Sequence, residues 1–160
     1  AIQRLRAVRE HIIGPLETVG YPVYAQHCDD MDTGTLVDMF REEPHACLLG
    51  TDAVRDGIDV PGDSLRLLVY DRVPWPRPTI LHKARRNVFG KKEYDDIMTR
   101  FKLKQAYGRL IRRADDKGVF VMLDSRLPSR LHNAFPGGVE IEKTGLMEAC
   151  LIIKNFLHTP

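Results

Sequence analysis

The chain carries, at residues 105–112, the sequence Gln105-Ala106-Tyr107-Gly108-Arg109-Leu110-Ile111-Arg112. On a helix with about 100° per residue, Gln105, Arg109 and Arg112 stand at i, i+4 and i+7 and share one face. Gly108 lies among them, and its missing side chain lets a large partner come close. A phosphate chain is the anion that two guanidinium groups favour, and a solvated basic face is the alternative. The opposite face is expected to pack and carries Leu103, Ala106, Tyr107, Leu110 and Ala114.

A second stretch, residues 50–62, reads Gly-Thr-Asp-Ala-Val-Arg-Asp-Gly-Ile-Asp-Val-Pro-Gly. It follows a short apolar strand, so Gly50 and Thr51 offer a flexible backbone and a hydroxyl where a phosphate oxygen can be bound. The alternative is that Thr51 or Asp52 caps the next helix. On its residues alone, this stretch predicts for Asp59 a carboxylate that pairs with an arginine.

Together the two stretches resemble motifs V and VI of superfamily 2 helicases. The string G-T-x-x-x-x-x-G-I-D-V-P-G, followed by an apolar strand and by D-R-x-P-W at residues 71–75, resembles the branch of DinG and XPD helicases. The resemblance extends from about Leu5 to about Leu157. It implies an α/β, RecA-like P-loop NTPase fold with a parallel sheet covered by helices on both faces. It also implies the second helicase domain, which lacks the phosphate loop.

The resemblance also assigns roles to residues. The catalytic set is Arg109, Arg112 and Gln105; the nucleotide-binding set is Gly57, Asp59 and Gly108; the DNA-binding set is Gly50, Thr51 and Arg55. ATP and Mg²⁺ are expected between this domain and an N-terminal RecA-like domain of the same polypeptide. Hydrolysis would drive movement along single-stranded DNA from 5′ to 3′, in DNA repair or replication. An iron–sulfur cluster is possible elsewhere in the full protein, but the cysteines here do not resemble its ligands.

Composition sets limits on the class of protein. The 160 residues are 43% hydrophobic and 29% charged, which fits one folded domain, residues 1–160, and indicates neither disorder nor a membrane span. Three scattered cysteines, Cys28, Cys47 and Cys150, favour a reducing cytoplasm and predict no metal site. Because Ala1 is not a Met and no leader follows, we expect a piece of a longer chain. The resemblance implies a strand before the helix at residues 2–19, so the first strand of the domain is expected to be truncated.

Charge is distributed unevenly along the chain. Residues 72–113 contain 13 Lys and Arg but 3 acids, whereas the remainder contains 11 basic residues and 19 acids. Such segregation favours contact with nucleic acid, although a basic loop that only keeps the protein soluble has the same composition. Trp75, between two prolines, could stack on a base or plug a loop.

Periodicity predicts alternating strands and helices. Helices are expected over residues 2–19, 35–42, 79–86, 93–114 (with a possible break near Phe101) and 146–157, and strands over 21–26, 46–49, 65–71 and 118–124. Two other functions remain open. A metal-dependent phosphoryl hydrolase would use Asp59, Asp71 and Asp124 at the strand ends, where capping or ion pairing is the alternative role. A nucleic-acid-binding module would keep the fold without turnover.

Overall fold

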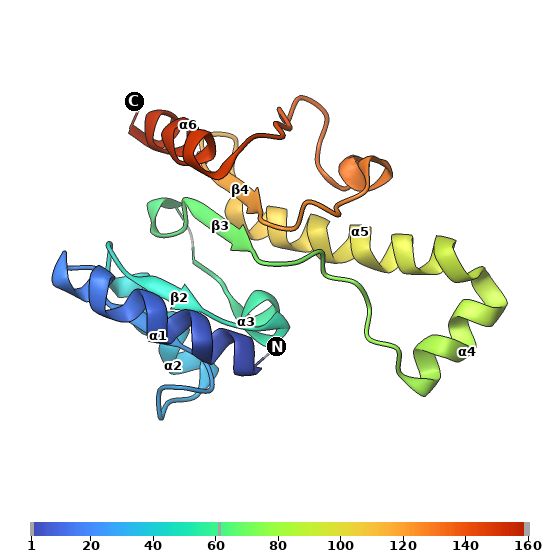
Figure 1. Ribbon diagram of the computed structural model, residues 1–160, viewed down its shortest axis with the longest axis horizontal. Helices are drawn as coiled ribbons and strands as arrows, with labels where there is room; N and C mark the ends of the chain where they lie inside the picture. Colours follow the sequence, from blue (N-terminus) through green and yellow to red (C-terminus); the bar gives the residue numbers. More distant parts are fainter. Residues whose placement is uncertain (1, 61, 159–160) are drawn as a thin grey trace. The chain divides into compact units, whose positions relative to one another are not determined.

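The computed structural model describes residues 2–60 and 62–158, which form two compact units (Figure 1). Unit 1 is Ala1–Leu65 and unit 2 is Arg66–Pro160. Each unit combines two short parallel strands with helices, so both have mixed α/β character. Within the described ranges, no helix has the length and apolar content needed to cross a membrane.

Unit 1 places the segment after its first strand beside the segment after its second. Its elements are α1 (Ile2–Thr18), β1 (Val23–Ala25), α2 (Thr33–Glu42), β2 (Cys47–Leu49), α3 (Asp52–Gly57) and the 3-10 helix η1 (Gly62–Ser64). The two strands pair in parallel, with Val23 opposite Cys47 and Ala25 opposite Leu49. Because parallel strands end at the same edge, the residues that follow Ala25 and Leu49 become neighbours.

The core of unit 1 is built around α2. The carboxylate of Asp32 accepts hydrogen bonds from the backbone N–H groups of Gly34 and Thr35, and this N-cap starts the helix. The apolar face of α2 then packs into the unit, as its spacing predicts. The buried hydrophobic residues of unit 1 are Leu5, Val23, Ala25, Leu36, Val37, Phe40, Val54, Ile58, Val60 and Leu65.

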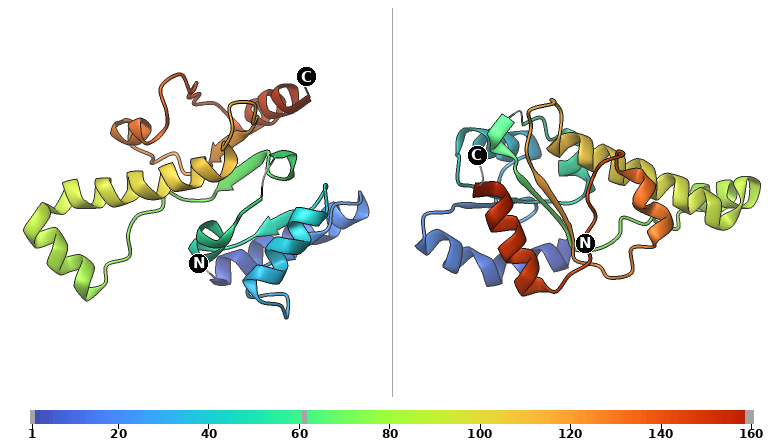
Figure 2. Two further views of the ribbon diagram at one scale, coloured as in Figure 1. Left: turned by 180° about the vertical axis from the view of Figure 1, so that it is seen from behind. Right: turned by 90° about the horizontal axis from the view of Figure 1, so that it is seen from above.

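Unit 2 contains a second parallel pair and a long helical hairpin. Its elements are β3 (Leu67–Tyr70), α4 (Ile80–Phe89), α5 (Lys91–Leu110), β4 (Val119–Met122), the 3-10 helix η2 (Ser129–Ala134) and α6 (Leu146–His158). Leu67 lies opposite Val119, and Tyr70 lies opposite Met122. The views from the front and from behind show α4 and α5 as a hairpin that extends away from this sheet (Figures 1 and 2).

The hairpin turns at Gly90, and the buried residues of α5 attach it to the rest of unit 2. Gly90 has a φ of 87°, a left-handed conformation that favours glycine, and it ends α4 and starts α5 at once. Helix α5 buries Leu103 in a cluster with Val73, Leu131 and Ala134. It buries Asp96 as well, whose carboxylate binds Arg130 of η2 at 2.6 and 3.1 Å. This hydrogen-bonded pair holds the pKa of Asp96 below its ordinary value.

Most predicted elements are present, with two differences. Helix α5 is continuous through Phe101 and ends at Leu110 rather than at Ala114. In the described part of the chain the four strands form two separate sheets, β1–β2 and β3–β4, rather than one sheet with helices on both faces. An apolar run reveals a strand because it is a local pattern, whereas strand order depends on contacts between distant segments. The RecA-like topology and the single-domain organisation stay predictions.

Candidate functional site

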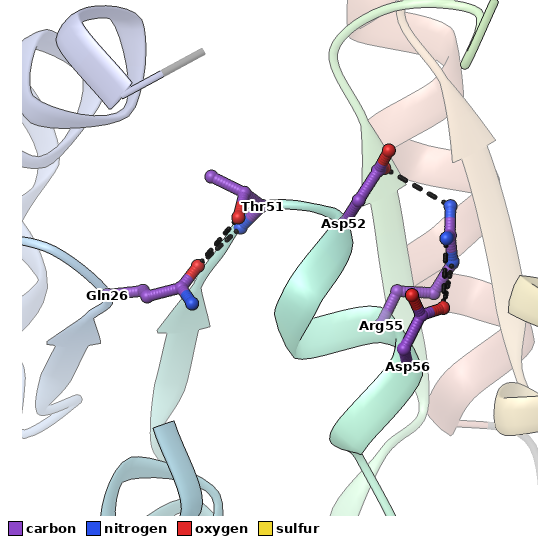
Figure 3. A network of polar contacts seen from close by, with 5 residues as sticks. All are labelled: Gln26, Thr51, Asp52, Arg55 and Asp56. Carbon is purple, nitrogen blue, oxygen red and sulfur yellow. Dashed lines mark hydrogen bonds and ion pairs between the residues drawn. The ribbon is translucent and has the colours of Figure 1, made fainter. Parts of the chain in front are cut away.

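The first candidate site lies at the end of β2. The backbone N–H of Thr51 donates to Oε1 of Gln26 at 3.0 Å, and the Thr51 hydroxyl donates to the same oxygen at 2.8 Å (Figure 3). Thr51 occupies the N-cap position of α3, but its side chain makes no capping hydrogen bond there. The interpretation of Thr51 as a side-chain cap is therefore wrong, because Gln26 engages the hydroxyl.

Gln26 is a site residue that sequence reasoning missed. It follows β1 directly, its side chain is only 6% exposed, and its Nε2 donates to the Thr33 hydroxyl at 3.0 Å. One end of the amide is thus anchored on Thr33 while the other holds Thr51. A polar residue directly after a buried strand, opposite another strand that ends in Gly-Thr, is the signal that indicates such a contact.

Gly50 has a packing role. A Cβ atom at this position would overlap with the side chain of Val54, which is buried beneath the turn. Only glycine therefore allows the chain to leave β2 and enter α3 at this angle. The predicted contact of Gly50 with DNA stays a prediction, and the packing requirement exists beside it.

Arg55 lies between two carboxylates of its own helix. Its guanidinium binds Asp52 at 3.1 Å and Asp56 at 2.9 Å, as Figure 3 shows, and the Arg55 side chain is 11% exposed. A contact between Arg55 and a DNA phosphate, which the resemblance implies, would require an exchange of at least one of these pairs.

The second half of this motif is more accessible. Gly57 and Asp59 are exposed, and a Cβ atom at Gly57 would meet no atom within 4 Å. The Arg41 guanidinium donates to the backbone carbonyl of Asp59 at 3.1 and 3.2 Å. This contact holds the segment on α2 through its backbone. The nucleotide-binding role of Gly57 and Asp59 stays a prediction.

The arginines of the second motif do not share one helix. Arg109 lies in the last turn of α5, but Arg112 lies beyond the helix, whose C-cap residue Ile111 is extended. The expected face with Gln105, Arg109 and Arg112 at i, i+4 and i+7 is therefore wrong for Arg112. Ala114 is likewise exposed rather than packed.

Two contacts explain why α5 ends early. The carboxylate of Asp116 accepts hydrogen bonds from the backbone N–H groups of Arg112 and Arg113, at 2.7 and 2.8 Å, and so replaces the helical carbonyls as their acceptor. Gly118 lies so close to Leu110 that an added Cβ atom would come within 2.6 Å of the Leu110 side chain. The hydrogen bonds from the backbone N–H groups of Arg113 and Arg112 lower the pKa of Asp116. The chain thus turns back toward β4 immediately after α5.

The end of α5 nevertheless has the chemistry that phosphate binding needs. Gln105 and Gly108 are exposed, Arg109 and Arg112 are half-buried, and no atom lies within 4 Å of a Cβ position at Gly108. Two arginines and an uncovered glycine within five residues of sequence are the kinds of group that bind the oxygens of a triphosphate. The end of α5 and the segment that leads from it to the amino end of β4 are therefore the candidate nucleotide-binding site in unit 2.

The carboxyl end of the same sheet has a different character. Asp124 accepts hydrogen bonds from the Arg126 guanidinium, at 2.8 and 3.2 Å, and from the backbone N–H of Val73 at 3.2 Å. The Arg126 bond is the largest cause of an Asp124 pKa far below its ordinary value. Within residues 2–60 and 62–158, no three His, Cys, Asp or Glu side chains gather as metal ligands would. Asp124 thus has the ion-pairing and loop-holding role.

Comparison with known proteins agrees with both motifs. The model of the family described as "Helicase C-terminal domain" matches residues 1–140. The chain is 36% identical over 138 residues to the ATP-dependent helicase DinG of Mycobacterium tuberculosis, a match that covers 82% of this chain and 20% of that protein. It is 36% identical over 124 residues to the ATP-dependent DNA helicase YoaA of Escherichia coli, covering 73% and 19%.

A further relative has a different name. The 3'-5' exonuclease DinG of Bacillus subtilis is 31% identical over 130 residues, which are 77% of this chain and 14% of that protein. The chain therefore spans 14% to 20% of the length of these relatives. The match to the family model includes both residues 50–62 and residues 105–112. The chain belongs to the helicase C-terminal domain family of DinG/YoaA-type helicases.

Proposed function

We propose that this chain is the second RecA-like domain of an ATP-dependent DNA helicase. The observation that supports this most directly is that α5 buries one face while Gln105, Gly108 and Arg109 near its end lie outside the buried set, with Arg112 two residues beyond Leu110. The names of the DinG and YoaA relatives support it as well. The domain would act together with an N-terminal RecA-like domain of the same polypeptide, in the cytoplasm, in DNA repair or replication.

In this proposal the arginines act on the nucleotide. Bound ATP supplies the γ-phosphoryl group that is transferred to water, with Mg²⁺ held by the other domain. Arg109 and Arg112 stabilise negative charge that develops on that group, a role worth about 10³- to 10⁵-fold in rate for arginine fingers. Gln105 would position the nucleotide, and the resemblance assigns nucleotide binding also to Gly108 of unit 2 and to Gly57 and Asp59 of unit 1.

The residues at the end of β2 would hold the nucleic acid. Gly50, Thr51 and Arg55 are proposed to bind the phosphates of single-stranded DNA, and alternate binding by the two domains moves the protein from 5′ to 3′. For Thr51 this requires rotation of the hydroxyl from Gln26 to a phosphate oxygen. Such a charge-assisted hydrogen bond is about twice as strong as the neutral one that it replaces, so the exchange is favourable.

The decisive experiment compares the isolated 160-residue chain with the full-length protein. We expect no ATP hydrolysis by the isolated chain, because it contains no phosphate loop, and hydrolysis stimulated by single-stranded DNA in the full-length protein. Phosphate release by the isolated chain that disappears in Asp71→Asn would instead support a metal-dependent phosphoryl hydrolase. Full-length protein that degrades DNA from its 3′ end but does not unwind it would contradict the helicase assignment.

A second experiment addresses the basic segment 72–104. If it contacts about four phosphates, the logarithm of the affinity for single-stranded DNA should fall with the logarithm of salt concentration with a slope of about −3. Lys91 and Lys92 are both exposed. Charge reversal at these two residues should flatten this slope if they contact the bound DNA strand, and should leave it unchanged if they do not. Binding that does not depend on salt would remove the segment from the proposed DNA contact.

A further inference from the structure

Helix α4 is amphipathic, but it packs with its polar side. His82 binds the Asp95 carboxylate of α5 at 2.7 Å, and Arg86 binds the same carboxylate at 3.1 Å. The rings of His82 and Phe89 also lie against Tyr94 of α5. His82, Arg86 and Phe89 stand at i, i+4 and i+7, so one side of α4 makes all these contacts.

The apolar side of α4 faces away from α5. Ile80, Ala84 and Val88 stand at i, i+4 and i+8, and Leu81, three residues before Ala84, lies next to them. We call these four residues the apolar stripe. The exposed fractions are 89% for Ile80, 59% for Leu81 and 76% for Val88. None of the residues of α4 is buried. A helix with this pattern normally buries such a stripe, and an exposed one is typical of a contact surface.

Basic residues border the stripe on both sides. Lys83 stands at i+3 from Ile80, and Arg85 stands at i+4 from Leu81; both are exposed. Neither of these two residues has a carboxylate partner within the described ranges. Helix α4 itself contains no acid. The surface is therefore an aliphatic ridge with one basic residue on each side, Lys83 on one and Arg85 on the other.

This combination selects among possible occupants. A second copy of the chain on the same surface would bring Lys83 and Arg85 against their own equivalents, and like charges repel. The phosphates of a nucleic acid would pair with Lys83 and Arg85 but would leave the stripe uncovered, because bases stack on rings whereas Ile80, Leu81 and Val88 are aliphatic. An amphipathic helix with an apolar face and acidic edges satisfies both features, because it covers the ridge and pairs with the basic borders.

We propose that the apolar stripe of α4 is a docking surface for an acidic amphipathic helix in another domain of the same full-length polypeptide. The proposal rests on the proposed function, in which this chain works inside a longer protein, and the chain does span only 14% to 20% of its relatives. From Ile80 to Val88 the stripe extends about 12 Å, enough for about two turns of a partner helix. Covalent linkage keeps such a helix at high effective concentration.

The test uses a cysteine in the stripe of the full-length protein. We expect Val88→Cys to react with a maleimide at least about 10-fold more slowly than the same substitution in the isolated 160-residue chain. Adding Lys83→Glu and Arg85→Glu should restore fast labelling in the full-length protein, since the reversed charges repel an acidic helix. The matched reversal at two exposed, distant lysines, Lys143→Glu with Lys154→Glu, should leave labelling slow.

A zero-length carbodiimide reagent, which joins amines to carboxylates, identifies the occupant. We expect Lys83 to be linked to an Asp or Glu in a segment with apolar residues at three- and four-residue spacing. Equal labelling of Val88→Cys in both proteins overturns the proposal. Protection that requires added DNA or anionic vesicles, or cross-links between isotopically different copies, overturns it too. None of these measurements uses ATP hydrolysis. Failure of the docking proposal can therefore be told apart from failure of the proposed helicase function.

Discussion

Residues 50–62 and residues 105–112 hold their polar groups in different ways. In the first stretch the Thr51 donors are bound by a buried, neutral amide, that of Gln26, which is itself anchored on Thr33. In the second, the backbone of Arg112 is bound by a charged group, the Asp116 carboxylate. The first arrangement depends on two strands lying side by side, and the second on a turn within six residues of sequence.

Because of this difference, substitutions in the two stretches should have different effects on stability and on function. Arg109 and Arg112 are half-buried and lie outside the buried set of α5, which includes Leu103 and Leu110, so we expect their substitution to change function more than the fold. The Thr51 hydroxyl, in contrast, belongs to a buried hydrogen-bond network. Substitutions around it should therefore change stability and function together.

The largest expected effect is at Arg112. In the full-length protein, Arg112→Ala should lower kcat for ATP hydrolysis by about 10²-fold or more and change ATP affinity much less, because the contact is made chiefly in the transition state. The matched control is Arg113→Ala, the next residue, whose side chain is exposed. Equal losses in the two variants would contradict the arginine-finger assignment.

The next effect concerns Gln26. Gln26→Met keeps the length of the side chain but removes the acceptor of both Thr51 donors and the partner of Thr33. Because a buried N–H is left without a partner, the free energy of unfolding should fall by about 1–3 kcal/mol, as measured by urea denaturation. Gln3→Met, at an exposed position in the same unit, is the control and should change little. A stable Gln26→Met protein would show that the network does not hold the site.

A smaller effect is expected at Thr51 itself. Thr51→Val should weaken the binding of single-stranded DNA by about 10-fold, the equivalent of one charge-assisted hydrogen bond, whereas Thr51→Ser should bind like the wild type. Fluorescence titration of a labelled oligonucleotide at fixed salt measures both. Unchanged affinity in Thr51→Val would remove the hydroxyl from the proposed DNA contact.

The smallest effect is a difference in pH dependence. The hydrogen bonds from Arg113 and Arg112 lower the pKa of Asp116, so their contribution is fully present above the ordinary Asp value of about 3.9 and is lost as the pH falls through the lower pKa of the folded protein. Hydrogen exchange followed from pH 6 down into the acid range, corrected for intrinsic rates, should show protection at Arg112 and Arg113 that is lost below the ordinary Asp value. The Thr51 amide, bound by neutral Gln26, should stay protected.

The matched control for this prediction is Asp116→Asn. It should reduce protection of Arg112 and Arg113 already at pH 6, because the amide oxygen is a weaker acceptor than a carboxylate. If acid affects the Thr51 amide and the Arg112 amide equally, the two stretches are not held by groups of different charge.

Local pattern was enough to predict much of this protein. The sequence predicted helices over residues 2–19, 35–42 and 146–157, which the structure has at 2–18, 33–42 and 146–158, and apolar runs predicted the four strands. The two motif strings predicted the family, which the match over residues 1–140 confirms. These features are readable because each depends on residues close together in the chain. The roles of individual site residues stay predictions.

Other features depend on contacts between distant residues. The pairing of Gln26 with Thr51 requires the parallel register of β1 and β2. The end of α5 at Leu110 is set by nearer residues, Asp116 and Gly118, whose contacts override a helical spacing that continues to Ala114. The sequence predicts a helix over residues 79–86, but the packed side of α4 carries the polar residues His82 and Arg86. Amphipathic spacing states which residues share a face, but only the partners available in three dimensions, here Asp95 and Tyr94, decide which face packs.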